Sequence, residues 1–252
     1  MTAKDTVLTA TGQLFGDQDP SAVDRWVAPG YVQHSSLAPD GPEGLLGLIA
    51  SLPEGFRYDL HRVLEDGDLV ALHGTYHGFG PVPLVAFDIF RVADGKLAEH
   101  WDALSPVVER TVSGRSQTDG PTEVTDLDKT EANRTLVAGF VENVLKGGKV
   151  DMLTDYLSTE SYAQHNAGIG DNLDGLGAAL QALAEQGIAM VYTTVHKVIA
   201  QGDFVLTVSE GTFGPTPTAF YDLFRVEDGK IVEHWDLTPE IPATLPHGNG
   251  LF

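Results

Sequence analysis

The chain repeats itself once, and this internal repeat constrains the fold more than any other feature. The segment FDIFRVADGKLAEHWD (87–102) returns in the second half as YDLFRVEDGKIVEHWD (221–236). Two further blocks return in the same order, YVQHS (31–35) as YAQHN (162–166) and HRVLEDGDLV (61–70) as HKVIAQGDFV (196–205). The three blocks are offset by 134, 131 and 135 residues, which indicates a repeated domain of about 125 residues, because solenoid units are far shorter. The chain is therefore a tandem duplication of one domain.

The duplication predicts a first domain over 1–112, a linker over 113–128 and a second domain over 129–252. The linker, SGRSQTDGPTEVTDLD, is polar and rich in turn-forming residues. In each half, segments with helical spacing of apolar residues come first, and β-rich segments joined by Asp-Gly turns follow. This order predicts an α+β fold in which helices cover one face of a curved antiparallel sheet.

Composition excludes several classes of function. Thirty-six acidic against 15 basic residues give a net charge of −21, which repels nucleic acid and anionic membranes. No apolar run is long enough to span a membrane, and the N-terminus lacks the pattern of a signal peptide. The absence of cysteine excludes disulfides, thiolate metal sites and a cysteine nucleophile, and it is compatible with the cytoplasm, where we expect the protein. No phosphate-binding or dinucleotide motif occurs, so no cofactor is expected.

The repeated motifs resemble the SnoaL-like polyketide cyclase family of the nuclear transport factor 2-like superfamily. The resemblance is carried by the Gln-His turns at 33–34 and 164–165 and by the motif DIFRVxDGKxxEHWD, and the closing pieces SGRSQTDGPTE and HGNGLF are also similar. It implies two tandem cone-shaped α+β domains that pair through their sheets as an intramolecular pseudo-dimer, with a further homodimer left open. The superfamily includes cyclases, isomerases, dehydratases, hydrolases and binding modules, so the resemblance implies the fold more firmly than the function.

One repeated strand carries an aspartate among apolar neighbours, Asp88 in the first half and Asp222 in the second. Apolar surroundings disfavour the charged form of a carboxyl group, which can then donate a hydrogen bond to a substrate oxygen or transfer a proton near neutral pH. The resemblance implies an oxyanion-hole donor here, as in the ketosteroid isomerases of the superfamily. The alternative is that each aspartate pairs with an arginine or caps a hairpin.

The motif His-Trp-Asp ends both repeats. Strand alternation puts His100 and Asp102 on one face, and His234 and Asp236 likewise. A nearby carboxylate orients an imidazole and raises its basicity, so both histidines are candidate catalytic residues and both aspartates candidate ligand contacts. Trp101 and Trp235 are candidate ligand contacts as well, or else core or interface aromatics.

Two further histidines, His34 and His165, lie at the turn that enters each cone. The superfamily resemblance implies that this region supplies the general base, and the alternative is that each imidazole fixes the turn by local hydrogen bonds.

The first half carries extra imidazoles at His73 and His77, four residues apart on one strand face. Such residues lie about 13 Å apart along a strand, too far for one metal ion, so no metal site is expected. The second half presents Thr207, Ser209 and Gly211 there, or Glu210 if the one-residue gap between the halves falls earlier, and it has Asn166 beside its turn histidine. His73, His77, Glu210 and Asn166 are candidate ligand contacts, and the imidazole-rich first pocket is favoured for catalysis.

These features together predict a cofactor-independent acid–base enzyme acting on a small apolar, polyketide-like carbonyl compound. The reaction would be an aldol-type cyclisation or a related isomerisation or dehydration, in which an imidazole or carboxylate removes a proton and Asp88 or Asp222 stabilises the enolate. The alternative is a non-catalytic module that binds or assembles around a small molecule in the same cavities.

Overall fold

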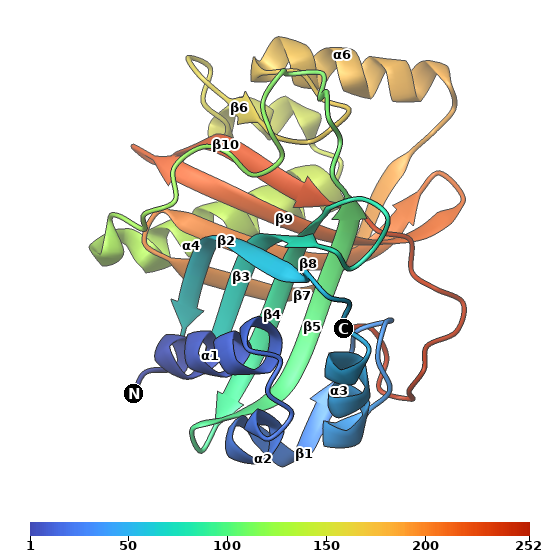
Figure 1. Cartoon of the computed structure of the whole chain (residues 1–252). Coiled ribbons are helices and arrows are strands. Elements are labelled where there is room, and N and C mark those ends of the chain that lie inside the picture. The colour runs from blue at the N-terminus through green and yellow to red at the C-terminus, as the bar shows by residue number, and fades with distance from the viewer. The chain divides into compact units, whose positions relative to one another are not determined.

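The two repeats form two separate units, each with its own sheet (Figure 1). The computed structural model describes all 252 residues. Unit 1 comprises Met1–Val107 together with Pro242–Phe252, and unit 2 comprises Val108–Ile241. These units differ from the expected boundaries at two places, because the linker joins unit 2 and the C-terminal segment joins unit 1. The predicted α+β fold with two tandem domains is confirmed.

Unit 1 begins with helices and ends with a β-meander. Thr2 and Asp5 form a capping box that starts the first helix, and Asp94 and Gly95 adopt the positive φ angles of a tight hairpin turn. The sheet order is β1-β5-β4-β3-β2, with β1 parallel to β5 and the other pairs antiparallel. The elements are α1 (Ala3–Thr11), η1 (Gly12–Gly16), α2 (Ala22–Trp26), β1 (Val27–Gln33), α3 (Gly41–Ala50), β2 (Arg57–Asp66), β3 (Leu69–His77), β4 (Leu84–Ala93) and β5 (Lys96–Pro106).

Unit 2 repeats this plan. Its sheet order is β6-β10-β9-β8-β7, with β6 parallel to β10 and the remaining pairs antiparallel, so each strand has a counterpart in unit 1. The elements are η2 (Leu127–Lys129), α4 (Thr130–Phe140), η3 (Val141–Lys146), η4 (Val150–Met152), α5 (Leu153–Tyr156), β6 (Ala163–Gln164), α6 (Asn172–Glu185), β7 (Met190–Gln201), β8 (Phe204–Phe213), β9 (Thr216–Glu227) and β10 (Lys230–Leu237).

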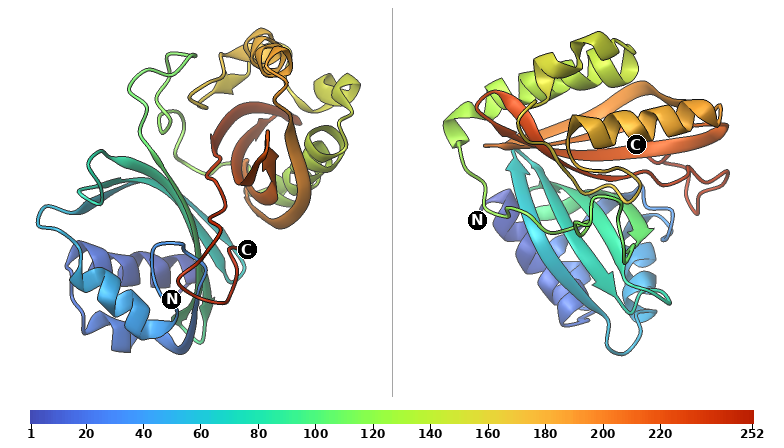
Figure 2. Two further views of the ribbon diagram at one scale, coloured as in Figure 1. Left: turned by 90° about the vertical axis from the view of Figure 1, so that its right-hand side faces the viewer. Right: turned by 90° about the horizontal axis from the view of Figure 1, so that it is seen from above.

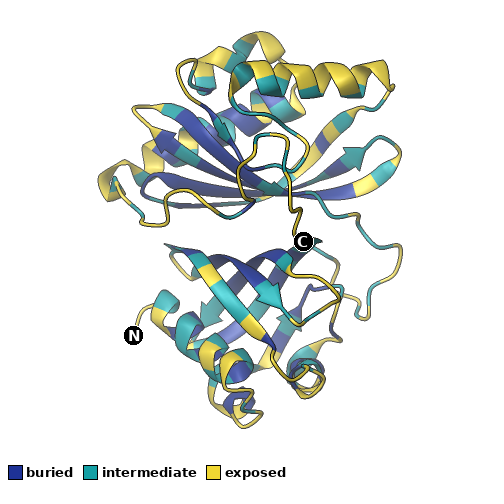
Figure 3. Cartoon of the chain, turned by 45° about the horizontal axis from the view of Figure 1, so that its top comes forward, coloured by how far each residue is buried: buried dark blue, intermediate teal, exposed yellow.

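In each unit, the helices lie on one face of a curved sheet (Figure 2). The core of unit 1 joins Val7, Leu14 and Ile49 of the helices to Val70 and Phe90 of the strands, and unit 2 has a matching cluster. Buried residues concentrate in the strands, whereas the outer sides of the helices are exposed (Figure 3). No helix of the chain is long and apolar enough to cross a membrane. The helix-covered face of each sheet is therefore where an interior site can form.

Candidate functional site

Two aspartates face each other across neighbouring strands inside unit 1. Asp88 on β4 stands in register with Asp102 on β5, so the two side chains share a face of the sheet. Like charges directly opposite each other repel, which favours a state in which one carboxyl group keeps its proton. Burial raises the pKa of Asp102 to about 6; the imidazole of His100 opposes this effect and the charge of Asp88 adds to it. Asp102 can therefore exchange a proton near neutral pH.

His100 bridges this carboxyl pair to strand β1. Its Nε2 lies 3.2 Å from Oδ1 of Asp88, and its Nδ1 lies 3.0 Å from Oε1 of Gln33. The backbone N–H of Ser35 also donates to that Oε1, and the Gln33 amide nitrogen donates to the Tyr31 hydroxyl, which fixes the orientation of the amide. Oε1 can only accept, so Nδ1 of His100 carries a proton. The Nε2 atom and Asp88 then share one proton between them.

A tyrosine completes the cluster. The hydroxyl of Tyr76 lies 3.1 Å from each carboxylate oxygen of Asp88. Burial, reinforced by the negative charge of Asp88, raises the pKa of Tyr76 well above its usual range. The hydroxyl therefore keeps its proton and donates to Asp88. We call this group of side chains the unit 1 cluster: Asp88, His100, Asp102 and Tyr76.

The unit 1 cluster lines a small apolar cavity that adjoins a larger one. The inner cavity, about 30 Å³, is bounded by Asp88, His100 and Asp102 and by apolar side chains that include Leu45 and Leu104. The outer cavity, about 310 Å³, lies along α1, η1 and β2. The two cavities share the side chains Phe15, Phe56, Tyr76 and Phe90. A molecule in the outer cavity thus lies beside the chamber that holds the carboxyl pair.

Unit 2 contains the same cluster of side chains. Asp222 and Asp236 stand in register, and Nε2 of His234 lies 3.1 Å from Oδ1 of Asp222 while its Nδ1 lies 3.1 Å from Oε1 of Gln164. The hydroxyl of Tyr192 lies 3.2 Å from Oδ2 of Asp222. We call this group of side chains the unit 2 cluster: Asp222, His234, Asp236 and Tyr192.

The net effect of burial, hydrogen bonds and neighbouring charges raises the pKa values of two groups in the unit 2 cluster, His234 and Asp236. Burial acts to lower the pKa of His234, but the hydrogen bond to Asp222 and the charges of Asp236 and Asp222 outweigh burial, so this pKa is raised. Burial raises the pKa of Asp236; the positive charge of His234 and the hydrogen bonds from Asn166 oppose the rise.

Two differences separate the clusters. The side-chain amide of Asn166 donates to both oxygens of Asp236, at 2.8 and 2.7 Å, where unit 1 has the shorter Ser35 near Asp102. Phe220, stacked on Tyr192 with ring centroids 4.1 Å apart, stands on the interior face where unit 1 has Ala86. The carboxyl group corresponding to Asp102 is thus tied to an amide, and a bulky ring fills the interior beside it.

The structure does not bring the two turn histidines to these clusters. Gln33 stands in register with His100, so alternation sends the next residue, His34, to the opposite face of the sheet. There its Nε2 lies 2.9 Å from Oε1 of Glu99, and its ring stacks on Trp101 with centroids 4.9 Å apart. His165 stands likewise against Glu233 and Trp235. Trp101 and Trp235 share this opposite face with the turn histidines.

His73, His77 and Glu210 also lie on the face opposite the clusters. His73 stands in register with Phe87 and stacks on it, while Nε2 of His77 pairs with Asp59 at 2.9 Å. The register makes Glu210 the counterpart of Thr75, since each pairs with the equivalent residue of the next strand. The unit 1 interior therefore owes its chemistry to the carboxyl pair and His100, not to additional imidazoles.

Sequence reasoning missed the two glutamines and the tyrosines. Gln33 and Gln164 directly precede the turn histidines His34 and His165, so their recurrence in both repeats could have identified them. Tyr76 carried no such signal, because its counterpart by register is Gly211. In unit 2 the hydroxyl comes instead from Tyr192 on the adjacent strand.

Each cluster also has the donor types of a metal site. The ligand atoms of Asp88, His100 and Asp102 lie within 4.8 Å of one another, as do those of Asp222, His234 and Asp236. An ion would have to replace the histidine–aspartate hydrogen bond in either cluster. The observed bonds suit proton sharing between these groups.

Comparison with known proteins agrees with the duplicated architecture. The model of the SnoaL-like domain matches residues 9–100 and again 137–234. No curated protein is similar enough to the chain to count as a match. Among solved structures, TsrD from Streptomyces laurentii is 23% identical, with 41% of this chain and 88% of that chain covered and a TM-score of 0.36. IdmH from Streptomyces antibioticus is 20% identical, with 42% and 93% covered and a TM-score of 0.36. Matched twice by its family model, the chain belongs to the SnoaL-like domain family and carries this domain in tandem.

Proposed function

We propose that unit 1 is a cofactor-independent acid–base catalyst that acts on a small apolar carbonyl compound. One observation carries this proposal: Asp102 is partly buried beside an apolar cavity, and the pKa of its carboxyl group is raised to about 6. A general base works best when its pKa lies near the operating pH, and an apolar wall excludes the water that would compete for the proton.

In the proposed reaction, Asp102 removes a proton from the carbon next to the substrate carbonyl. The electron pair moves onto the carbonyl oxygen, where the proton shared by His100 and Asp88 supplies the stabilising hydrogen bond. The enolate carbon then attacks the carbon of a second carbonyl in the same molecule, and Asp102 returns its proton to the new alkoxide oxygen, which completes an aldol cyclisation. In an isomerisation, Asp102 instead returns the proton to another carbon of the enolate. Tyr76 supports this step by donating to Asp88 and keeping that carboxylate in place.

The cavities suggest the shape of the substrate. The inner chamber of about 30 Å³ accommodates a group about the size of one water molecule. The outer cavity of about 310 Å³ is large enough for the apolar body of a small ligand, and Leu8, Leu60 and Leu72 are among its walls. We propose that the reacting carbonyl end enters the inner chamber while an apolar ring system occupies the outer cavity.

We propose a lesser catalytic role for unit 2. Hydrogen bonds from Asn166 engage both oxygens of Asp236 and weaken it as a base, and Phe220 occupies interior space. The alternative function, non-catalytic binding of a small molecule, stays a prediction from the sequence. An intramolecular pseudo-dimer, a further homodimer and a cytoplasmic location stay predictions from the sequence.

The test is α-proton exchange in deuterated water, with a bicyclic aromatic ketone such as β-tetralone as the probe. We expect the wild-type chain to accelerate exchange and the Asp102→Asn variant to lose most of this acceleration. The matched variant Asp236→Asn is expected to keep it. Tight binding of the ketone without accelerated exchange would favour the binding module, and exchange that survives Asp102→Asn would contradict the assigned base.

A further inference from the structure

Each unit is completed by the segment that follows the last strand of the other repeat. The chain leaves β5 of unit 1, and residues 108–125 then pack into unit 2. It leaves β10 of unit 2, and Pro242–Phe252 then pack into unit 1. The same exchange thus occurs twice, once with the linker and once with the C-terminal segment.

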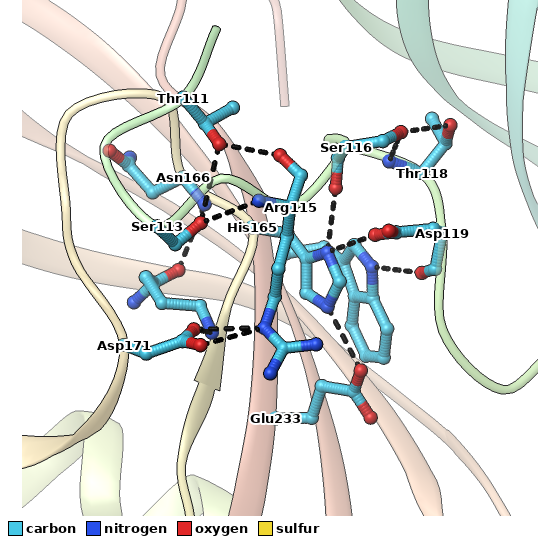
Figure 4. Close-up of polar contacts among 12 residues, drawn as sticks. Thr111, Ser113, Arg115, Ser116, Thr118, Asp119, His165, Asn166, Asp171 and Glu233 are labelled. Atoms are coloured by element: carbon cyan, nitrogen blue, oxygen red, sulfur yellow. Dashed lines mark hydrogen bonds and ion pairs between the residues drawn. The ribbon is translucent and has the colours of Figure 1, made fainter.

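In unit 2 the linker binds the turn that carries His165 through hydrogen bonds and an ion pair (Figure 4). The backbone oxygen of Ser116 lies 2.7 Å from Nδ1 of His165, and the indole of Trp235 donates to the backbone oxygen of Asp119 at 3.0 Å. Arg115 pairs with Asp171 at 2.9 Å, and Asp171 in turn accepts from the backbone N–H of Gln164.

In unit 1 the C-terminal segment contacts the turn that carries His34, and its bond to that histidine matches the bond from Ser116 to His165. The backbone oxygen of Gly250 lies 2.9 Å from Nδ1 of His34, and Nε2 of His247 lies 2.8 Å from the backbone oxygen of Ser35. The side-chain amide of Asn249 donates to the backbone oxygen of Gln33 at 3.0 Å.

Asn249 also has a second role that parallels Arg115. It hydrogen-bonds to Asp40, and Asp40 accepts from the backbone N–H of Gln33 at 2.9 Å. Asp40 stands immediately before α3, as Asp171 stands immediately before α6. A polar side chain of the incoming segment, an aspartate before a helix and the glutamine of the turn therefore form the same chain of contacts in both units.

These contacts end at the clusters. Oε1 of Gln33 accepts a hydrogen bond from Nδ1 of His100, and the Ser35 hydroxyl hydrogen-bonds to Asp102. The segment holds the backbone of Gln33 and Ser35 on one side of the turn, and their side chains orient the imidazole and the carboxyl group on the other side. His34, fixed between Gly250 and Glu99, anchors the segment to the turn and does not touch the cavity cluster.

We propose that the C-terminal segment is a positioning element for the unit 1 cluster, with Asn249 and His247 as its positioning residues. The linker likewise positions the unit 2 cluster, through Arg115. The first repeat therefore depends on the end of the second repeat for the orientation of His100. The expected effect on catalysis rests on the proposed function, but the orientation itself does not.

The test uses the full chain and compares two sets of substitutions. The double variant Asn249→Ala/His247→Ala removes the side-chain contacts of the C-terminal segment, and Arg115→Ala removes the equivalent contact of the linker. The imidazole nitrogen NMR signals of His100 and His234 report tautomer and hydrogen bonding in each cluster. We expect the double variant to shift the signals of His100 and leave those of His234 unchanged, and Arg115→Ala to do the reverse.

Activity supplies a separate readout. A 1 Å misplacement of a catalytic group can lower a rate by about 100-fold. We expect a smaller displacement in the double variant, which should therefore exchange the ketone α-proton about 10-fold more slowly with little change in KM. If His100 keeps its signals in the double variant, or if either set of substitutions shifts both histidines alike, the positioning role is overturned. If the wild-type chain shows no exchange but the histidine signals respond as expected, the proposed function fails and the positioning role stands.

Discussion

Replacing Asp102 by asparagine should stabilise the protein, and the gain should depend on pH. The pKa of Asp102 is about 6 against an ordinary value of 3.8, a difference that corresponds to about 3 kcal/mol at about 1.36 kcal/mol per pKa unit. The folded state holds this proton more tightly than the unfolded state does. Stability is therefore lost as pH rises from about 4 through about 6, and it stays at the lower level above that range.

Asparagine has nearly the same shape as aspartate and no charge to desolvate. We therefore expect Asp102→Asn to raise the free energy of unfolding by about 2 kcal/mol at pH 8, because about 1 kcal/mol of the gain is lost with the Ser35 hydrogen bond. Near pH 4, where Asp102 is protonated in the folded wild type, this gain should disappear. Asp236→Asn is the control and should gain less, because the amide gives up one of the two oxygens that accept from Asn166.

The assay is native-state hydrogen exchange in urea, read at amides of β4 and β5 so that only unit 1 is scored. Measurements at pH 4 and pH 8, corrected for the intrinsic exchange rate, give the two free energies. A variant that is no more stable than wild type at pH 8 would refute the reasoning, as would an equal gain at both pH values.

Three further substitutions test the packing and the charges. Ala86→Phe should close the unit 1 interior and abolish ketone binding in calorimetry, at a cost of about 1–3 kcal/mol from overpacking; unchanged affinity would contradict the position of the cavity. His234→Gln should destabilise more at pH 6 than at pH 9 in denaturant titrations, because the stabilisation tied to its raised pKa is present below 6.5 and is lost as pH rises through that pKa; an equal loss at both would refute it. Gly44→Ala should lower the melting temperature, since an added Cβ would lie 2.0 Å from the Pro39 oxygen, whereas Gly47→Ala, with open space around it, should not.

Local sequence patterns explain much of the fold. The repeat identified two equivalent domains, and the Asp-Gly pairs marked the hairpins that the structure contains at Asp94 and Asp228. Alternation alone puts His100 and Asp102 on one face. The register across β4 and β5 then stands Asp88 opposite Asp102, which follows from the hairpin turn between these strands.

Contacts between distant parts of the chain could not be predicted in this way. The parallel pairing of β1 with β5 decides that Gln33, not His34, stands beside His100, and no local pattern encodes a pairing across more than sixty residues. The same pairing removes His34 from the cavity face. The boundaries at 112 and 128 missed the exchange of terminal segments, because a polar segment such as the one around Asn249 has the composition of a loop wherever it docks.

The protonation of Asp102 is the central claim, and a carboxyl carbon NMR titration of the full chain tests it most directly. The signal can be assigned by its absence from the Asp102→Asn variant. We predict an inflection near pH 6 for Asp102. An inflection below pH 4 would show an ordinary, solvated carboxylate and would contradict the proposed base.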